Sequence, residues 1–293
     1  MARISSRTFR VGPVTFGIEV DGGERAFSGL AALDGRRVDA DTNHRILLVK
    51  DNGFAPPNRS LRTHHNSSRG TSVYQQGHTT YYMSPAFCVS VSTADAAAEL
   101  HYVHLDEDTL WELRLLVRWL FKTLCGRADY TYLPGQFVRA GQSSLLVAGH
   151  RECGIIDVTD ELEREGATSY GHTVAVDSDL EQIVSLPFNV VSGRPEDRPL
   201  QEDSQSFPGP SRIVLATSWN DPNSQLRPLP RDEGIRKLSA LNRRAYEYFS
   251  EDQVEDHEKR YFDILPEDVF FELYVGLDRS KLNNTLAQFL ART

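Results

Sequence analysis

The sequence has few cysteines, no long hydrophobic run and no excess of basic residues. Its three cysteines, Cys88, Cys125 and Cys153, form no C-x-x-C pair, which disfavours a disulfide framework and favours a reducing compartment. No apolar stretch reaches the roughly 18 residues of a membrane-spanning helix, and the amino terminus lacks the apolar segment of a secretory signal. We therefore expect a cytoplasmic protein without a membrane partner.

Basic residues are outnumbered, because 32 Lys and Arg stand against 41 Asp and Glu, for a net charge of −9. This balance disfavours a nucleic-acid partner. The length of 293 residues suggests one large domain or two modest ones.

The chain does contain a change of pattern near residue 105. Before it, short segments such as Val14–Val20 alternate polar and apolar residues with period two, which indicates strands. The polar stretch Pro56–Gly70 is expected to be an exposed connection. The sequence predicts a β-rich N-terminal region over residues 1–104 and a second, α/β domain over residues 105–293.

The clearest helix spans Asp106–Gly126, with acidic residues at its start, leucines along one face and Gly126 at its end. Predicted strands and helices alternate after it. The strands are Tyr130–Val138, Ser143–Ala148, Thr173–Val176, Arg212–Thr217 and Val269–Val275, and the helices are Asp157–Glu165, Arg231–Tyr248 and Ser280–Leu290. This order predicts an α/β core with a loop at the carboxyl end of a strand.

Residues 145–156, Leu-Leu-Val-Ala-Gly-His-Arg-Glu-Cys-Gly-Ile-Ile, have the frame of a phosphate-binding loop without its charged groups. Gly149 and Gly154 keep the glycine spacing after a strand, but Ile155 and Ile156 stand where the motif has Lys and Ser or Thr. A triphosphate would lack the ammonium group, and Mg²⁺ would lack the hydroxyl. Alternatively, the two glycines only turn the chain from strand to helix.

Acidic residues follow the loop at once. Asp157, Asp160 and Glu161 fall in the first turn of the predicted helix, where carboxylates offset the attraction of the helix dipole for phosphate. Asp157 or Thr159 could also cap the backbone amides. We therefore predict weak or absent binding of ATP.

Four collinear stretches of the chain share their order with a known family. They are the helix and strand of residues 106–138, the loop of residues 143–154, Gly166–Asp177 with Ile183–Phe188, and the segments Ile213–Thr217, Leu226–Leu238 and Phe271–Asp278. Together they resemble the bacterial HPr kinase-like proteins, a branch of the P-loop fold related to phosphoenolpyruvate carboxykinase. The resemblance implies a P-loop HPr kinase-like core over roughly residues 100 to 293.

The resemblance also implies two site elements that this chain lacks. The family has a Ser-Asp-Asp-type element, whose carboxylate takes the proton of the acceptor serine, where this chain has Gly171-His172-Thr173. It often has a histidine where this chain has Pro134. Lysine, metal-binding hydroxyl, acidic base and histidine are thus missing together, which argues against ordinary phosphotransfer.

Two histidines are the catalytic candidates for an altered mechanism. His172 could act as a general base, because the ordinary imidazole pKa is about 6.5. His150 lies in the loop beside Arg151, which could bind an anion. For both histidines the alternative is a structural or solvated side chain, and no metal site is predicted.

Three functional hypotheses follow. The first is a non-catalytic, regulatory protein with a degenerate nucleotide site and no cofactor, which binds a peptide or protein; proteins of the resembled family often occur beside genes for peptide modification. The second is a nucleotide-dependent transferase that acts on a peptide or protein with ATP and Mg²⁺ through His172. The third is a homo-oligomeric scaffold that uses the β-rich region for assembly.

Overall fold

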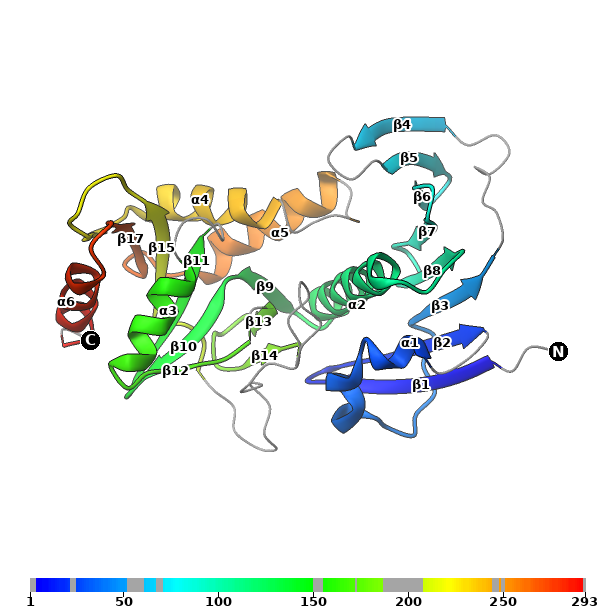
Figure 1. The fold of residues 1–293 in the computed structure, drawn as a ribbon, viewed down its shortest axis with the longest axis horizontal. Helices are drawn as coiled ribbons and strands as arrows, with labels where there is room; N and C mark the ends of the chain where they lie inside the picture. Colours follow the sequence, from blue (N-terminus) through cyan, green and yellow to red (C-terminus); the bar gives the residue numbers. More distant parts are fainter. Residues whose placement is uncertain are drawn as a thin grey trace. The chain divides into compact units, whose positions relative to one another are not determined.

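The fold was analysed in a computed structural model, which describes residues 4–21, 25–51, 61–66, 71–149, 155–171, 173–186, 208–243, 248 and 251–291. The chain divides into two compact units, and the first continues through Ala128. It is a mixed α/β protein (Figure 1). None of the described helices is long and apolar enough to cross a membrane.

The first unit is built on one mixed sheet with the strand order β1-β2-β3-β8-β7-β6-β5-β4. Its strands are β1 (Ile4–Val11), β2 (Val14–Asp21), β3 (Arg45–Lys50), β4 (Leu61–Asn66), β5 (Thr71–Gln76), β6 (Thr79–Met83), β7 (Phe87–Ser92) and β8 (Ala97–Tyr102). β2, β3 and β8 are parallel neighbours, and the other pairs are antiparallel. The short helices α1 (Arg25–Ser28) and η1 (Ala31–Arg36) follow β2. The expected connection Pro56–Gly70 therefore contains a strand, β4, which pairs with β5.

Helix α2 (Glu107–Arg127) packs against β2, β3 and β8 of this sheet. The carboxylate of Asp106 accepts a hydrogen bond from the backbone amide of Thr109 at 2.9 Å, which caps the helix as its acidic start predicts. Nearly every residue of its middle turns is buried. By its contacts α2 belongs to the first unit. The division consequently follows Ala128, whereas the sequence analysis placed it before residue 105.

The second unit contains two sheets. The larger one has the order β12-β10-β11-β15-β17-β16, and the smaller one has the order β14-β13-β9. Their strands are β9 (Tyr130–Pro134), β10 (Gln136–Ala140), β11 (Ser143–Gly149), β12 (Thr168–Ser169), β13 (Thr173–Asp177), β14 (Ile183–Ser185), β15 (Arg212–Ser218), β16 (Gln225–Pro228) and β17 (Phe270–Val275). β11, β15 and β17 run parallel at the centre of the larger sheet, and β16 is antiparallel at its edge.

Helices cover both faces of this parallel centre (Figure 1). On one face α3 (Ile155–Arg164) and α6 (Arg279–Leu290) pack together over residues such as Val147 and Val214. On the other face α4 (Arg231–Arg243) and α5 (Glu251–Ile264) enclose a second core with the smaller sheet. Two buried cores therefore fix the layers of the second unit.

One expected strand is divided in the structure. The predicted strand Tyr130–Val138 is two strands, β9 and β10, which belong to different sheets and meet at Gly135. Gly135 has a φ of +147°, and a Cβ there would lie 2.6 Å from the carbonyl oxygen of Val147, so only glycine fits. Helix α4 covers Arg231–Arg243 of the predicted helix Arg231–Tyr248, and residues 244–247 lie outside the described residues. The separate helix α5 was not predicted.

α4 lies unusually close to the sheet. A Cβ on Gly234 would lie 2.3 Å from Cγ of Phe270, so the helix can approach β17 only because this residue is glycine. α5 is attached to the smaller sheet by Tyr261, whose buried hydroxyl donates to the carbonyl oxygen of Tyr132 at 2.8 Å. These contacts determine where α4 presents its polar side chains.

Candidate functional site

The predicted strand, loop and helix are centred on the carboxyl end of β11. β11 ends at Gly149 and α3 begins at Ile155, so the loop joins these two elements. Of the predicted site residues, His150, Arg151, Gly154 and His172 lie outside the residues that the structure describes. Gly149, Ile155 and Ile156 are described and can be placed.

Gly149 has a steric role. It is the parallel partner of Ala216 on β15, and a Cβ on it would lie 2.7 Å from the Ala216 carbonyl oxygen and 3.3 Å from Cγ1 of Ile155. Any larger residue would push apart two central strands and the first turn of α3. Close packing is therefore a sufficient reason for glycine at this position.

The two isoleucines have different surroundings. Ile155 packs against the core beneath α3 and α6, whereas Ile156 is 50% exposed. Neither brings a cation or a hydroxyl to the first turn of α3. Packing explains Ile155, but it does not explain the exposed Ile156.

The acids of α3 are partly neutralised. Asp157 forms an ion pair with Arg279, the first residue of α6, and Glu161 is paired with Arg164. The Thr159 hydroxyl donates to the carbonyl oxygens of Ile155 and Ile156 at 3.1 and 3.0 Å, so it does not cap the amides as the sequence analysis allowed. In the structure Asp157 is the one acid in the first turn of α3, and its charge is paired, so this turn carries less free negative charge than the sequence indicates.

Two of the positions identified through the family resemblance are neighbours in the fold. Pro134 at the end of β9 is the register partner of Thr173 on β13. A Cβ on Gly171 would lie 3.0 Å from Oγ of Ser185 and 3.3 Å from the carbonyl oxygen of Leu186, so a side chain there requires those atoms to move. The structure thus brings the two segments together, and close packing against Ser185 and Leu186 explains the glycine at residue 171.

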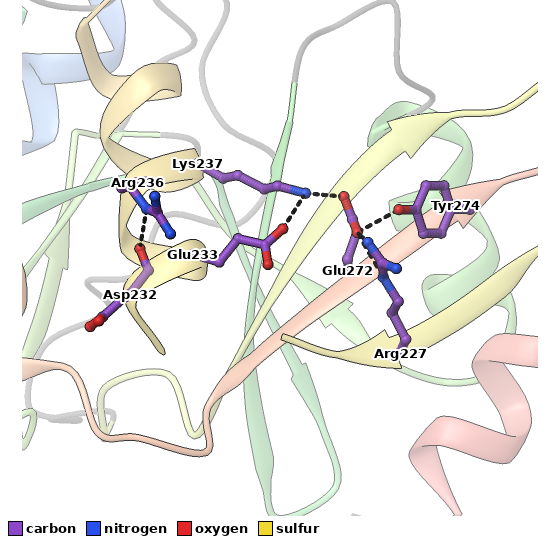
Figure 2. Close-up of polar contacts among 7 residues, drawn as sticks. All are labelled: Arg227, Asp232, Glu233, Arg236, Lys237, Glu272 and Tyr274. Carbon is purple, nitrogen blue, oxygen red and sulfur yellow. Dashed lines mark hydrogen bonds and ion pairs between the residues drawn. The ribbon is translucent and has the colours of Figure 1, made fainter. Parts of the chain in front are cut away.

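A polar network that the sequence does not predict lies on the face that α4 covers (Figure 2). At its centre is Glu272 on β17, which is 2% exposed. Its carboxylate accepts hydrogen bonds from the Arg227 guanidinium (Nε at 3.0 Å), from the Tyr274 hydroxyl at 2.7 Å and from the Lys237 ammonium group. Lys237 also pairs with Glu233 at 3.3 Å, one helical turn before it.

This network lies close to the loop. Sheet register aligns Glu272 with Leu215 on β15, and Leu215 with Ala148 on β11, which is the residue before Gly149. On the other side Glu272 is the partner of Arg227 on the edge strand β16. Glu272 is the third of the six residues of β17, so the network lies within the sheet, three residues before the carboxyl end of that strand, where α/β folds bind ligands.

The network fixes the protonation of its members. Burial alone would raise the pKa of Glu272, but hydrogen bonds from Lys237, Tyr274 and Arg227 lower it on balance below its ordinary 4.5. Burial works against the Lys237 ammonium group, yet its contacts with Glu272 raise its pKa. The hydrogen bond to Glu272 raises the pKa of the Tyr274 phenol. At neutral pH the carboxylate is ionised and its partners are protonated, so the network holds no group poised to exchange a proton.

The described cations around this end of the sheet are paired, and Arg151 of the loop lies outside the described residues. Arg227 and Lys237 are bonded to Glu272, and Arg279 is bonded to Asp157. Lys281, in the first turn of α6, donates to the side-chain oxygen of Asn223 at 2.7 Å. In the part of the chain that the structure describes, no group of three His, Cys, Asp or Glu side chains is arranged to hold a metal ion.

No family model matches the chain, and no curated protein sequence matches it significantly.

Proposed function

We propose that the chain is an HPr kinase-like protein with a degenerate nucleotide site, which binds a peptide or protein partner and performs no phosphotransfer. The order of elements supports the fold part of this proposal. A strand, β11, leads through the loop into α3, and its parallel neighbour β15 ends beside it. P-loop proteins hold phosphates at the corresponding position, at the amino end of the helix.

The observation that carries the proposal is the pairing of charge around the loop. Ile155 is packed into the core, and the nearest described cation of α6, Arg279, is bound to Asp157. A triphosphate at this helix end would meet no uncommitted ammonium or guanidinium group from α3, and it would have to separate an existing ion pair. Both effects weaken nucleotide binding relative to a working loop.

The residues of the matching segment support the absence of ordinary catalysis. Gly171, His172 and Thr173 stand where the resembled family has its Ser-Asp-Asp-type element, and none of them carries a carboxylate. A nucleotide at the loop would therefore lack the acid that takes the acceptor proton in that family.

Exposed apolar side chains support the binding of a partner. Ile156 is 50% exposed and Leu277 is 72% exposed, and each lies within two residues of the ion pair between Asp157 and Arg279. Apolar groups beside a paired charge are suited to contact with side chains of a peptide or protein rather than with phosphate. The first hypothesis from the sequence is therefore the one we retain.

Calorimetry with MgATP tests the nucleotide part. We expect no binding in the micromolar range for the natural chain, and a micromolar, Mg²⁺-dependent dissociation constant would contradict the proposal. The variant Ile155→Lys with Ile156→Ser restores the two missing groups, and we expect it to gain measurable affinity. Ile156→Ser alone is the matched control, because it supplies the hydroxyl without the charge.

A screen for nucleotide-dependent turnover tests the catalytic part. Turnover that is lost in His172→Ala or His150→Ala, but kept in the surface control His78→Ala, would favour the transferase hypothesis over the one proposed. We expect no turnover above the level of a protein-free reaction.

A further inference from the structure

A groove lies at the end of the larger sheet that is opposite the loop between β11 and α3. It lies at the amino ends of the parallel strands β11, β15 and β17, where a cavity of about 860 Å³ opens to solvent. Its lining residues are Gln142, Ser143, Ser211, Arg212, Pro228, Leu229, Pro230, Glu267, Asp268, Phe270 and Phe271. This volume falls within the range of pockets that bind small molecules and short peptides.

Arg212 provides a cation that has no acidic partner among the described residues. Its guanidinium lies over the rings of Phe271 and Phe289, at 5.3 and 5.2 Å from their centroids. Within the described residues it makes neither an ion pair nor a side-chain hydrogen bond. A guanidinium held on aromatic rings keeps its N–H groups available, and its geometry matches that of a carboxylate.

Two carboxylates lie in the same groove. Glu267 and Asp268 are exposed in the connection between α5 and β17, and neither is paired with a cation among the described residues. They therefore offer a site for an ammonium or guanidinium group. One cation and two carboxylates also make the groove unfavourable for a phosphate ligand.

The remaining lining is apolar. Phe271 and the exposed prolines Pro228 and Pro230 contribute apolar surface, whereas Phe270 and Leu229, at 1% and 5% exposure, are buried in the core on the α4 face. Leu229 itself is held in place because its backbone amide donates to the carbonyl oxygen of Phe270 at 2.9 Å. Such a surface suits an apolar side chain that lies between two charged groups.

We propose that this groove binds the carboxyl end of a peptide that carries a basic side chain. The terminal carboxylate is held by Arg212, an apolar side chain near the terminus contacts Phe271 and its register partner Pro228, and the basic side chain reaches Glu267 and Asp268. A chain terminus is favoured over an internal acidic side chain because it places a carboxylate and an apolar side chain on one residue. Arg212 and Phe271 are juxtaposed in the same way.

The inference rests on the proposed function only in taking the partner to be a peptide, and the two fail separately. MgATP binding decides the fate of the nucleotide site at the carboxyl ends of the strands. Peptide retention decides the fate of the groove, whatever the nucleotide result.

The experiment exposes the full chain to two pools of short peptides of mixed sequence, one with free carboxyl termini and one amidated, and identifies retained peptides by mass spectrometry. We expect retention of peptides with a free terminus and a Lys or Arg. Amidation, or Arg212→Gln, should reduce retention about tenfold or more, the effect of losing a charge-assisted hydrogen bond. Arg212→Lys should retain part of the binding.

Further variants separate the parts of the groove. Glu267→Gln with Asp268→Asn should remove the preference for basic residues but keep the need for a free carboxylate. Arg236→Gln is the matched control, because this guanidinium donates to the backbone of Asp232 on α4 and lies outside the groove. Thermal melts of each variant show whether a loss of retention reflects unfolding.

Retention of neither pool, or equal retention by the natural chain and Arg212→Gln, would overturn the proposal. Retention of amidated peptides through internal Asp or Glu, abolished by Arg212→Gln, would also overturn it, because the ligand would then be an internal acidic segment.

Discussion

In the larger sheet of the second unit, charged side chains are paired differently at the two ends of the parallel strands. Arg227 and Lys237 are bound to Glu272 within the sheet, and Arg279 is bound to Asp157 at the carboxyl ends of the strands. These charges therefore cancel within the protein. At the amino ends of the strands Arg212, Glu267 and Asp268 line one groove, and none of the three forms an ion pair among the described residues. Internally paired groups stabilise a fold, whereas unpaired groups remain available to a ligand. Among the described residues, the unpaired charges therefore lie at the amino ends of the parallel strands, away from the loop that the sequence motif marks.

The largest expected effect concerns α4, which connects the two ends of the strands. Gly234→Ala places a Cβ against the Phe270 ring and should destabilise the second unit by about 3 kcal/mol, at the upper end for overpacking. Urea unfolding measures this change in the free energy of unfolding. Gly35→Ala is the control, since a Cβ there meets nothing within 4 Å, and a similar loss in both variants would contradict the steric explanation.

Removal of the Glu272 carboxylate should leave cations without their partner, which is the situation of Arg212 among the described residues at the amino ends of the strands. Glu272→Gln leaves Arg227 and Lys237 without their buried partner, and we expect a loss of about 2 kcal/mol because hydrogen bonds to a charged group are broken. The same variant should bind inorganic phosphate more tightly than the natural chain. Chemical denaturation and a phosphate titration check the two effects, and unchanged stability would show that the network is dispensable.

Acid should act through the same carboxylate. The folded-state pKa of Glu272 is lowered below 4.5, so its contribution is fully present above pH 4.5 and is lost as the pH falls through the lowered value. Between pH 7 and pH 3 the natural chain should therefore lose more stability than Glu272→Gln. Unfolding curves at both pH values provide the comparison, and parallel losses in the two proteins would contradict it.

The smallest effect is expected at the surface. Asp157→Asn breaks the ion pair between Asp157, which is 36% exposed, and Arg279, which is 64% exposed. Because exposed ion pairs contribute little, the free energy of unfolding should fall by about 0.5 kcal/mol. If the paired charge is what keeps phosphate away, this variant should also show weak binding of MgATP that salt abolishes. Calorimetry at low and high ionic strength tests this directly.

Local patterns predicted the elements whose signals lie close together in the chain. α2 follows from its acidic start and the spacing of its leucines, and β11 with α3 follows from an apolar run, a glycine and a polar helix. α5 was missed because few apolar residues interrupt its polar sequence, and its burial depends on contacts such as that of Tyr261 with Tyr132. The break at Gly135 was missed because the apolar run continues across it, and only the tertiary pairing assigns its two halves to different sheets.

The candidate site was predictable only in part. The sequence predicts a phosphate-binding frame that lacks its lysine and hydroxyl at Ile155 and Ile156, and this stays a prediction. It does not identify Glu272, because the partners Lys237 and Arg227 are 35 and 45 residues away. One signal was present in Phe-Phe-Glu-Leu-Tyr, where a single carboxylate interrupts large apolar residues of a strand and therefore requires a buried partner.

The parallel pairing of the second unit determines when it can fold during synthesis. Every strand of the first sheet precedes residue 103, so that sheet can form early on the ribosome. The central strands of the larger sheet end at Gly149, Ser218 and Val275, and long crossovers separate them. Pairing across such separations is slow, so nearly the whole chain must emerge before this sheet closes. Until then β11 has its hairpin partner β10 but lacks its parallel neighbour β15, so one side of this apolar strand stays unpaired and exposes the nascent chain to aggregation.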